Sequence, residues 1–355
     1  MLTNAVINFT KGNVERELFY AKSAEYMDHY AKGTVQPVMH EDMLRMFAKE
    51  VELISGMKMD AVPDMAMYTN FRQVQEAAFA VLSMVVQPLV VNAAMKSFGA
   101  IAEFKNGAFG DSFSFNISPR DLFVVTKGAR SQRSYDIERQ YKTTKTIVPE
   151  FNTITVGVSL YEILVGTQTL AEYISKAALS LNAALSYDIY DTFSTAMNAL
   201  ATSGDSALKV SGYTQDSAIQ LAQKIQAWTS TKPIFLGTTL ALSKILPTNA
   251  NYRMDLGTDY VKLGHLRDFN GFACVELEQI ADYTTEFATK IADDEIYVIA
   301  PSGSDKLVKV CMEGSMLADV GGTFDTANLM TTGNLRLAWG VGVITGGIGG
   351  MIKLA

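Results

Sequence analysis

The 355-residue sequence is poor in the residues that most often carry out catalysis or bind metals. It has three scattered histidines and two cysteines, Cys274 and Cys311, which are too far apart to form a CxxC pair. This spacing does not indicate a disulfide framework or a thiolate zinc site, and we expect two reduced, buried thiols. The motifs GxxxxGK[ST], HExxH and GxSxG are absent, and no GxGxxG opens a helix after a strand. We therefore expect no catalytic residue, no cofactor and no bound metal.

Two features could still support an active site between residues 211 and 327. His265 lies between Gly264 and Leu266, a setting more typical of a structural histidine than of a catalytic base. The acidic run 293–295 could bind a divalent cation, although such a run more often forms a solvated turn before a strand. An α/β enzyme is for these reasons the alternative to a structural protein.

Charged residues are also scarce, at 19% of the chain, and the net charge is −7. An acidic balance argues against a dedicated nucleic-acid-binding protein. The N-terminus has no basic segment leading into an apolar one, so no secretory signal is predicted. Residues 77–95 contain no charge and approach the length of a membrane span. Polar residues and a proline interrupt them, which favours a buried or interface helix kinked at the proline: Ser83, Gln87, Pro88 and Asn92.

No proline occurs between Pro149 and Pro233, and this gap contains the most regular pattern of the chain. Apolar residues recur at helical spacing from Ser159 to Thr202. Ser159 and Glu162 have the spacing of a capping box. One helix of this length would span about 65 Å, more than a compact domain needs, and predicts a flat or extended molecule.

Other helices are predicted before and after this long one. Residues 40–54 carry an apolar stripe that ends at Gly56, and residues 70–98 form a second helical region that we expect to break at Pro88. A mixed α/β region follows the long helix, with a helix over 214–228 and several short strands. Alternating apolar residues and glycines near the C-terminus predict one or two further strands.

Residues 107–158 are strand-like and predict a long β-hairpin with a polar tip. Residues 120–145 hold seven basic and three acidic residues, an excess of four positive charges, which leaves −11 for the rest of the chain. Such a hairpin could dock onto acidic surfaces of another copy, or it could be a solvated loop or contact nucleic acid. The candidates for contacts between subunits are Arg130, Arg133, Arg139, Lys142 and Lys145.

The order of these elements resembles the major capsid protein of tailed double-stranded DNA phages, the Hong Kong 97-type fold. The segment that carries the resemblance best is ERQYKTTKTIVPEFNTITVGVSLYEILVG, residues 138–166, which is similar to the return arm of that family's extended loop where it enters the spine helix. The resemblance implies an α+β fold with an N-terminal arm, an extended loop, a spine helix and a separate α/β axial domain. The implied divisions are an arm at 1–36, a peripheral domain at 37–106, an extended loop at 107–152, a second peripheral part at 153–210 with the spine helix at 159–202, an axial domain at 211–327 and a terminal peripheral strand at 328–355.

The same resemblance implies a function and a set of partners. Copies would assemble through hexamers and pentamers into an icosahedral shell, and the shell would hold packaged double-stranded DNA bound without sequence specificity on its inner face. Portal and scaffolding proteins would be further partners, and no membrane is expected. The protein would be part of the virion and would assemble in the host cytoplasm. An encapsulin-type nanocompartment shell is the nearest alternative.

Overall fold

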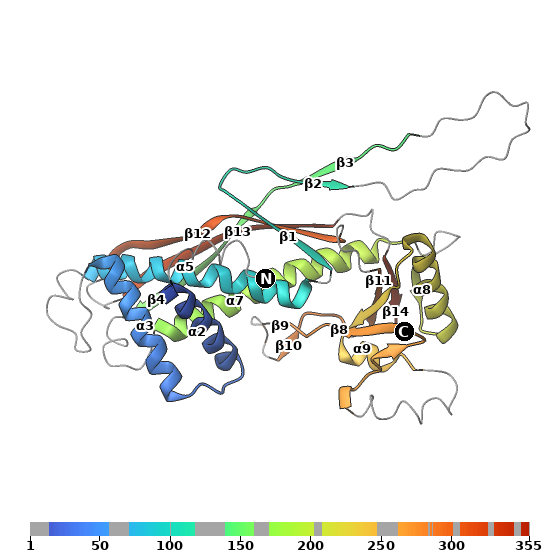
Figure 1. Ribbon diagram of the computed structural model, residues 1–355, viewed down its shortest axis with the longest axis horizontal. Coiled ribbons are helices and arrows are strands. Elements are labelled where there is room, and N and C mark those ends of the chain that lie inside the picture. The colour runs from blue at the N-terminus through green and yellow to red at the C-terminus, as the bar shows by residue number, and fades with distance from the viewer. Residues whose placement is uncertain are drawn as a thin grey trace, which may run out of the picture.

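The computed structural model shows an elongated molecule in which one long helix joins two β-sheets (Figure 1). Four helices and a four-stranded sheet form one part, and a six-stranded sheet with two shorter helices forms the other. The structure describes residues 14–56, 71–99, 101–117, 139–159, 170–201, 208–246, 262–282, 285, 287–300, 306–325, 330–343 and 349–354.

The first part is built on helices whose apolar faces pack against one another. They are α2 (Val14–Ala31), α3 (Pro37–Ser55), α5 (Phe71–Phe98) and α7 (Leu170–Asn198). The helix predicted at 40–54 is confirmed as α3. It begins at a proline, whose missing N–H is not needed in the first turn, and Gly56 ends it in the left-handed conformation.

Helix α5 continues through Pro88, so the predicted break there is wrong. Neighbouring packing offsets the cost of the proline, since Val85, Leu89 and Val90 are almost fully buried. Gln87 adds a polar contact: its side-chain amide donates to the Gly314 carbonyl at 2.8 Å and accepts from a backbone N–H of the same strand. Within the described ranges, no helix has the length and apolar character needed to cross a membrane.

One face of the four-stranded sheet covers α5 and α7. Its strand order is β1 (Ala102–Gly107), β12 (Val308–Asp325), β13 (Met330–Val343) and β4 (Glu150–Ser159). Trp339 and Leu337 of β13 and Val310 of β12 are buried in the core that this face shares with the helices.

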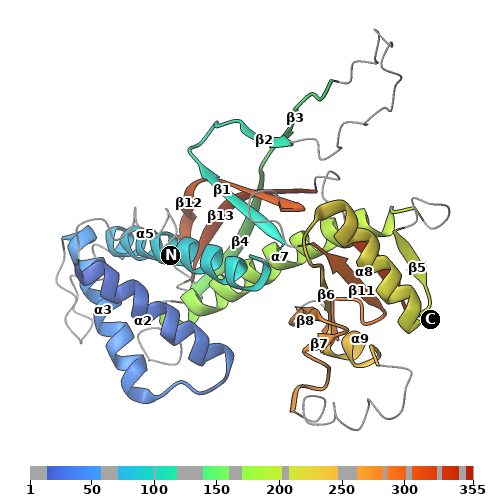
Figure 2. The ribbon, with the colours of Figure 1, turned by 45° about the vertical axis from the view of Figure 1, so that its right-hand side comes forward.

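The predicted hairpin is confirmed at its base. Strands β2 (Phe113–Ile117) and β3 (Thr143–Ile147) pair antiparallel, with Phe113 opposite Ile147. In both ribbon views the hairpin leaves the body on the side of the sheet away from α7 (Figure 2).

The second part is organised around a mixed sheet. Its strands, in order, are β5 (Lys209–Ser211), β14 (Gly349–Lys353), β11 (Glu295–Ile299), β6 (Ile234–Gly237), β8 (Phe272–Glu276) and β7 (Asp268–Phe269). Helices α8 (Gln215–Thr229) and α9 (Thr239–Ser243) pack on it, and a small pair, β9 (Ala281–Asp282) and β10 (Ala288–Thr289), lies nearby. Thr214 caps α8 through a reciprocal hydrogen-bond pair with Ser217. The α/β character predicted for this region is confirmed.

The long helix is shorter than predicted. Ser159 does not cap it, because Ser159 is the last residue of β4 and pairs with Met330. The helix begins at Leu170 and has 29 residues, a length of about 43 Å. Leu160 and Glu162, which were expected in its first turn, lie outside the described residues. Even so, α7 still contacts both sheets, as a spine between the two parts would (Figure 2).

Two of the predicted domain boundaries are also corrected. β12 was assigned with residues 211–327 to the axial domain. It pairs instead with β1 and β13 in the four-stranded sheet, called the peripheral sheet below. β14 was assigned with residues 328–355 to the peripheral domain. It pairs instead with β11 and β5 in the six-stranded sheet, called the axial sheet below. The chain therefore crosses between the two parts once more after β13. A local apolar pattern cannot predict which distant strand a given strand will pair with.

The predicted arm at 1–36 is also corrected over its described part. Helix α2 packs on the body rather than extending from it, since Phe19 and Tyr26 are buried against the neighbouring helices.

Candidate functional site

The hairpin is the first candidate site, and its base is seated on two glycines of β13. Ile147 lies so close to this strand that a Cβ on Gly342 would be 2.8 Å from its Cδ1, and a Cβ on Gly340 2.9 Å from its Cγ2. Phe113, Phe115 and Ile147 are buried together with Cys311 of β12. The alternating glycines near the C-terminus therefore provide the space into which the hairpin base packs.

Two lysine side chains also contact the base of the hairpin. Lys309 of β12 is 2% exposed, forms an ion pair with Glu103 and lies 5.9 Å from the centre of the Phe115 ring. Lys105 lies 5.4 Å from the same ring centre and donates to the Ser114 carbonyl at 3.0 Å. Cation–π and ion-pair contacts strengthen as solvent is excluded, so these contacts hold the base of the hairpin on the sheet.

The structure places the five predicted contact residues differently. Arg139 and Lys142 are exposed on the returning arm of the hairpin. Lys145 donates its ammonium to the Val343 carbonyl of its own chain at 2.8 Å, which joins the hairpin to the end of β13. Arg130 and Arg133 lie outside the described residues.

Sequence reasoning did not propose the apolar residues on this arm as contacts between subunits. Tyr141 is 71% exposed and Val148 is 76% exposed. Tyr141 interrupts a run of polar residues, and a large aromatic side chain in a solvated hairpin is the signal that could have identified it. Arg139, Tyr141 and Lys142 together present an aromatic ring between two cations.

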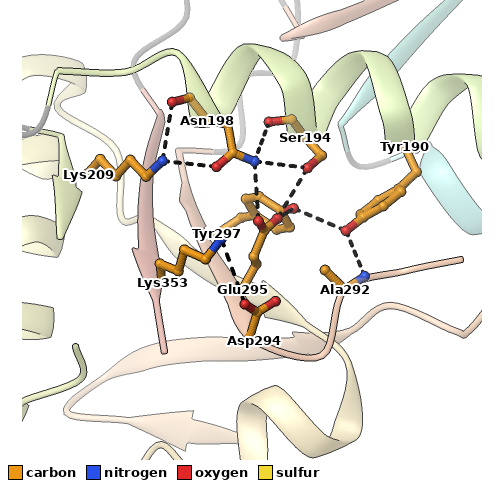
Figure 3. Close-up of polar contacts among 9 residues, drawn as sticks. All are labelled: Tyr190, Ser194, Asn198, Lys209, Ala292, Asp294, Glu295, Tyr297 and Lys353. Carbon is orange, nitrogen blue, oxygen red and sulfur yellow. Dashed lines mark hydrogen bonds and ion pairs between the residues drawn. The ribbon is translucent and has the colours of Figure 1, made fainter. Parts of the chain in front are cut away.

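A second candidate site is a polar cluster where the end of α7 meets the axial sheet (Figure 3). Its centre is Glu295, which is 5% exposed. The Glu295 carboxylate accepts from Ser194 Oγ and from Asn198 Nδ2, both at 3.2 Å, and from the Tyr297 hydroxyl. These three donors come from two different parts of the fold, so the cluster holds the helix to the sheet.

Neighbouring groups extend this cluster. Lys209, in the first strand after α7, donates to Asn198 Oδ1 at 2.9 Å. Tyr190 lies 3.3 Å from the Tyr297 hydroxyl and accepts from the backbone N–H of Ala292 at 2.9 Å. Burial, together with the Glu295 hydrogen bond, raises the pKa of Tyr297 well above its usual value, so this phenol stays protonated and donates.

The acidic run 293–295 is used for structure and is not gathered around one point. Asp293 accepts from Thr238 Oγ1 at 2.7 Å, Asp294 lies 3.8 Å from Lys353 Nζ, and Glu295 points at α7. Over the part of the chain that the structure describes, no three histidine, cysteine or carboxylate side chains are grouped as metal ligands.

The remaining reactive residues also have structural surroundings. His265 is 5% exposed and its Nδ1 lies 3.2 Å from the Leu263 carbonyl, as expected of a structural histidine. Cys311 is buried and Cys274 is half-buried. Burial raises the pKa of Cys274 to about 12 and also raises that of Cys311, so both thiols are unreactive as nucleophiles near neutral pH.

The spine helix is anchored to the peripheral sheet by a second polar contact. Trp339 of β13 donates its indole N–H to Asp188 Oδ2 at 2.8 Å. Burial raises the pKa of Asp188, and the hydrogen bond from Trp339 opposes that rise. The helix is thus hydrogen-bonded to one sheet at its middle and to the other at its end.

Comparison with known proteins gives this architecture a context. Residues 21–353 match the protein family described as "SPbeta prophage-derived putative capsid protein YonB". No curated protein matches the chain.

Among solved structures, the chain is similar to the capsid of the native GTA particle, with 13% identity, a TM-score of 0.51, and coverage of 74% of this chain and 90% of that one. It is also similar to the capsid of cyanophage P-SCSP1u, with 11% identity, a TM-score of 0.50, and coverage of 73% and 88%. At these identities the likeness concerns the fold, and it confirms the capsid-type α+β architecture predicted from the sequence.

Proposed function

This chain belongs to the YonB family of capsid proteins, and we propose that copies of it join through hexamers and pentamers into an icosahedral shell around packaged double-stranded DNA. Family and fold together make it a structural capsid protein. We propose the shell geometry, the packaged DNA and the further partners in addition to this role.

The observation that carries the proposal is the projecting hairpin. An isolated two-stranded hairpin is marginally stable in water, yet this one extends beyond the body with Arg139, Tyr141 and Lys142 exposed (Figure 1). All three side chains face solvent in the subunit. They are suited to a second copy, whose residues outside 120–145 carry a net charge of −11.

Such a contact joins two different surfaces and is therefore heterologous. Heterologous contacts form closed rings when the rotation between copies closes, which is how hexamers and pentamers arise from one interface. An elongated molecule whose two parts are joined by one long helix (Figure 1) is suited to a thin wall built from such rings.

We further propose that portal and scaffolding proteins are separate partners, and that the subunit assembles in the host cytoplasm before it becomes part of the virion. Contact with DNA on the inner face would be electrostatic and independent of sequence, and weak for a subunit of net charge −7.

The test is to express the chain and examine it by size-exclusion chromatography and electron microscopy. Closed particles are expected. A variant with glutamine at Arg130, Arg133, Arg139 and Lys142 should lose most of its particles while its circular-dichroism spectrum and melting temperature stay near those of the parent.

A matched control removes four exposed charges away from the hairpin, at Arg45, Lys176, Lys232 and Lys244, and should assemble normally. Only small oligomers of the parent chain under all assembly conditions would refute the proposal.

A further inference from the structure

A groove of about 650 Å³ lies between the two parts of the molecule. Helices α2, α5 and α7 form its walls, and residues 275–278 at the end of β8 close one side. Apolar side chains of the three helices, including Met27, Leu89 and Leu179, line it. Its volume is within the range of sites that bury a large side chain or a small ligand.

The groove contains a buried polar atom, the side-chain oxygen of Asn182 on α7. Within the part of the chain that the structure describes, this oxygen accepts no hydrogen bond. A buried acceptor left without a donor destabilises the folded state. A donor that enters the groove from outside would remove this destabilisation, and it would have to arrive at the end of a group that fits apolar walls.

The rim of the groove is acidic. The charged residues among those that line it are three carboxylates, Asp28, Glu276 and Glu278, and one lysine, Lys96. Asp28 and Glu278 are exposed and available to a cationic partner. The groove therefore suits an aromatic ring that has a hydrogen-bond donor at its tip and positive charges beside it.

The same chain presents a segment with these properties, residues 139–142. Tyr141 provides a 71%-exposed ring with a hydroxyl at its tip, and Arg139 and Lys142 are exposed beside it. An aromatic side chain with a polar tip is the residue type most often found at the centre of protein interfaces.

Within one subunit, the hairpin base and the groove lie on opposite sides of the four-stranded sheet. The hairpin base packs on the face of β13 that carries Gly340 and Gly342. Trp339, on the opposite face, contacts α7, whose surface lines the groove. The sheet thus lies between the hairpin base and α7 within one subunit (Figure 2), and a contact between hairpin and groove would join two copies.

We propose that Tyr141 of one subunit docks in this groove of the neighbouring subunit, donates its hydroxyl to Asn182, and brings Arg139 and Lys142 onto Asp28 and Glu278. This inference rests on the proposed function, since it assigns the surface that receives the hairpin in the shell. Because the two surfaces differ, the contact is heterologous and can repeat around a ring.

The first test is an exchange of charge. Asp28→Lys with Glu278→Lys should reduce particle yield at least tenfold, and so should Arg139→Glu with Lys142→Glu, because each places like charges at the contact. All four changes together restore opposite charges and should recover most of the particles. If the four-residue variant assembles no better than either pair, the groove is not the acceptor.

The second test fixes the partners covalently in a Cys274→Ser background. Tyr141→Cys combined with Val275→Cys, which lines the groove and is 40% exposed, should yield disulfide-linked multimers when assembled particles are oxidised. The matched control pairs Tyr141→Cys with Val38→Cys, which is 67% exposed on α3, and should stay monomeric on a denaturing gel.

The outcomes separate the two proposals. Particles of the parent chain without specific cross-linking would overturn the groove assignment and leave the capsid function standing. A parent chain that forms no particles would overturn the function itself.

Discussion

Asn198, the last residue of α7, donates its side-chain amide to the buried carboxylate of Glu295, the first residue of β11, at 3.2 Å. This contact joins the end of the spine helix to the axial sheet. Hydrogen bonds are directional, so the contact restricts the angle between the two parts more closely than apolar packing alone.

Replacing Glu295 by alanine should destabilise the subunit by about 2–4 kcal/mol, because the buried Tyr297 hydroxyl and two partly buried donors, Ser194 and Asn198, would lose this acceptor. Glu295→Gln should cost less, about 1–2 kcal/mol, since one acceptor oxygen is kept while the new amide faces other donors. Urea unfolding of the unassembled subunit measures both. Asp294→Asn is the control, because Asp294 and its partner Lys353 are each about half exposed, and it should change stability by less than about 0.5 kcal/mol.

The two glycines beneath the hairpin should respond differently to an added methyl group. At Gly342 the new Cβ meets only the flexible tip of Ile147, whereas at Gly340 it lies 2.8 Å from the backbone carbonyl of Val148. Gly340→Ala should therefore cost about 1–3 kcal/mol and Gly342→Ala less.

Ile147→Val removes the Cδ1 atom that a Cβ on Gly342 would contact. It should rescue Gly342→Ala and leave Gly340→Ala unrescued, which a double-mutant cycle on unfolding free energies would measure. Equal coupling at both positions would contradict this account of the hairpin seat.

Both thiols should react slowly in the folded subunit. Burial raises the pKa of Cys274 to about 12, so at pH 8 roughly one molecule in 10,000 holds a thiolate there. Labelling with an aromatic disulfide reagent should be at least a hundredfold slower than in guanidinium chloride, and single Cys274→Ser and Cys311→Ser variants assign each rate. Fast stoichiometric labelling of native protein would show that the surroundings of the thiols differ from those described.

Local patterns predicted most elements of this fold. The apolar stripe with a terminal glycine gave α3, the apolar pattern over 214–228 gave α8, and alternation within residues 107–158 gave β2 and the later part of β4. These signals depend on neighbours in the sequence and on the geometry of a single element.

Contacts between distant segments could not be predicted in this way. Ser159 and Glu162 satisfy a capping rule, but pairing of Ser159 with Met330 places the serine in a strand instead. β12 and β14 were assigned to the wrong sheets because each pairs with strands far away in the sequence. Glu295 was considered as part of an acidic run, and only the fold brings it to Asn198.

The last prediction concerns Asp188 and the pH dependence of stability. Burial raises the pKa of this carboxyl above its ordinary value of 3.8, and nearby Asp191 and Glu150 act in the same direction, whereas Trp339 and Lys290 oppose them. In the pH range just above 3.8 the folded state therefore binds more protons at this site than the unfolded state. The contribution of Asp188 to the free energy of unfolding must fall as pH rises through that range and stay constant above it.

Asp188→Asn keeps an oxygen that can accept from the indole N–H of Trp339 and removes the titration. The free energy of unfolding of Asp188→Asn, minus that of the parent, should increase from pH 4 upward and then level off. Taking this difference removes the contribution of all other carboxyls, which titrate alike in both proteins. Asp188→Ala removes the acceptor as well and should cost about a further 1–3 kcal/mol at every pH. A difference between parent and Asp188→Asn that is flat from pH 4 to 7 would show that this carboxyl titrates alike in the folded and unfolded chain, and that its burial beneath the sheet carries no electrostatic cost.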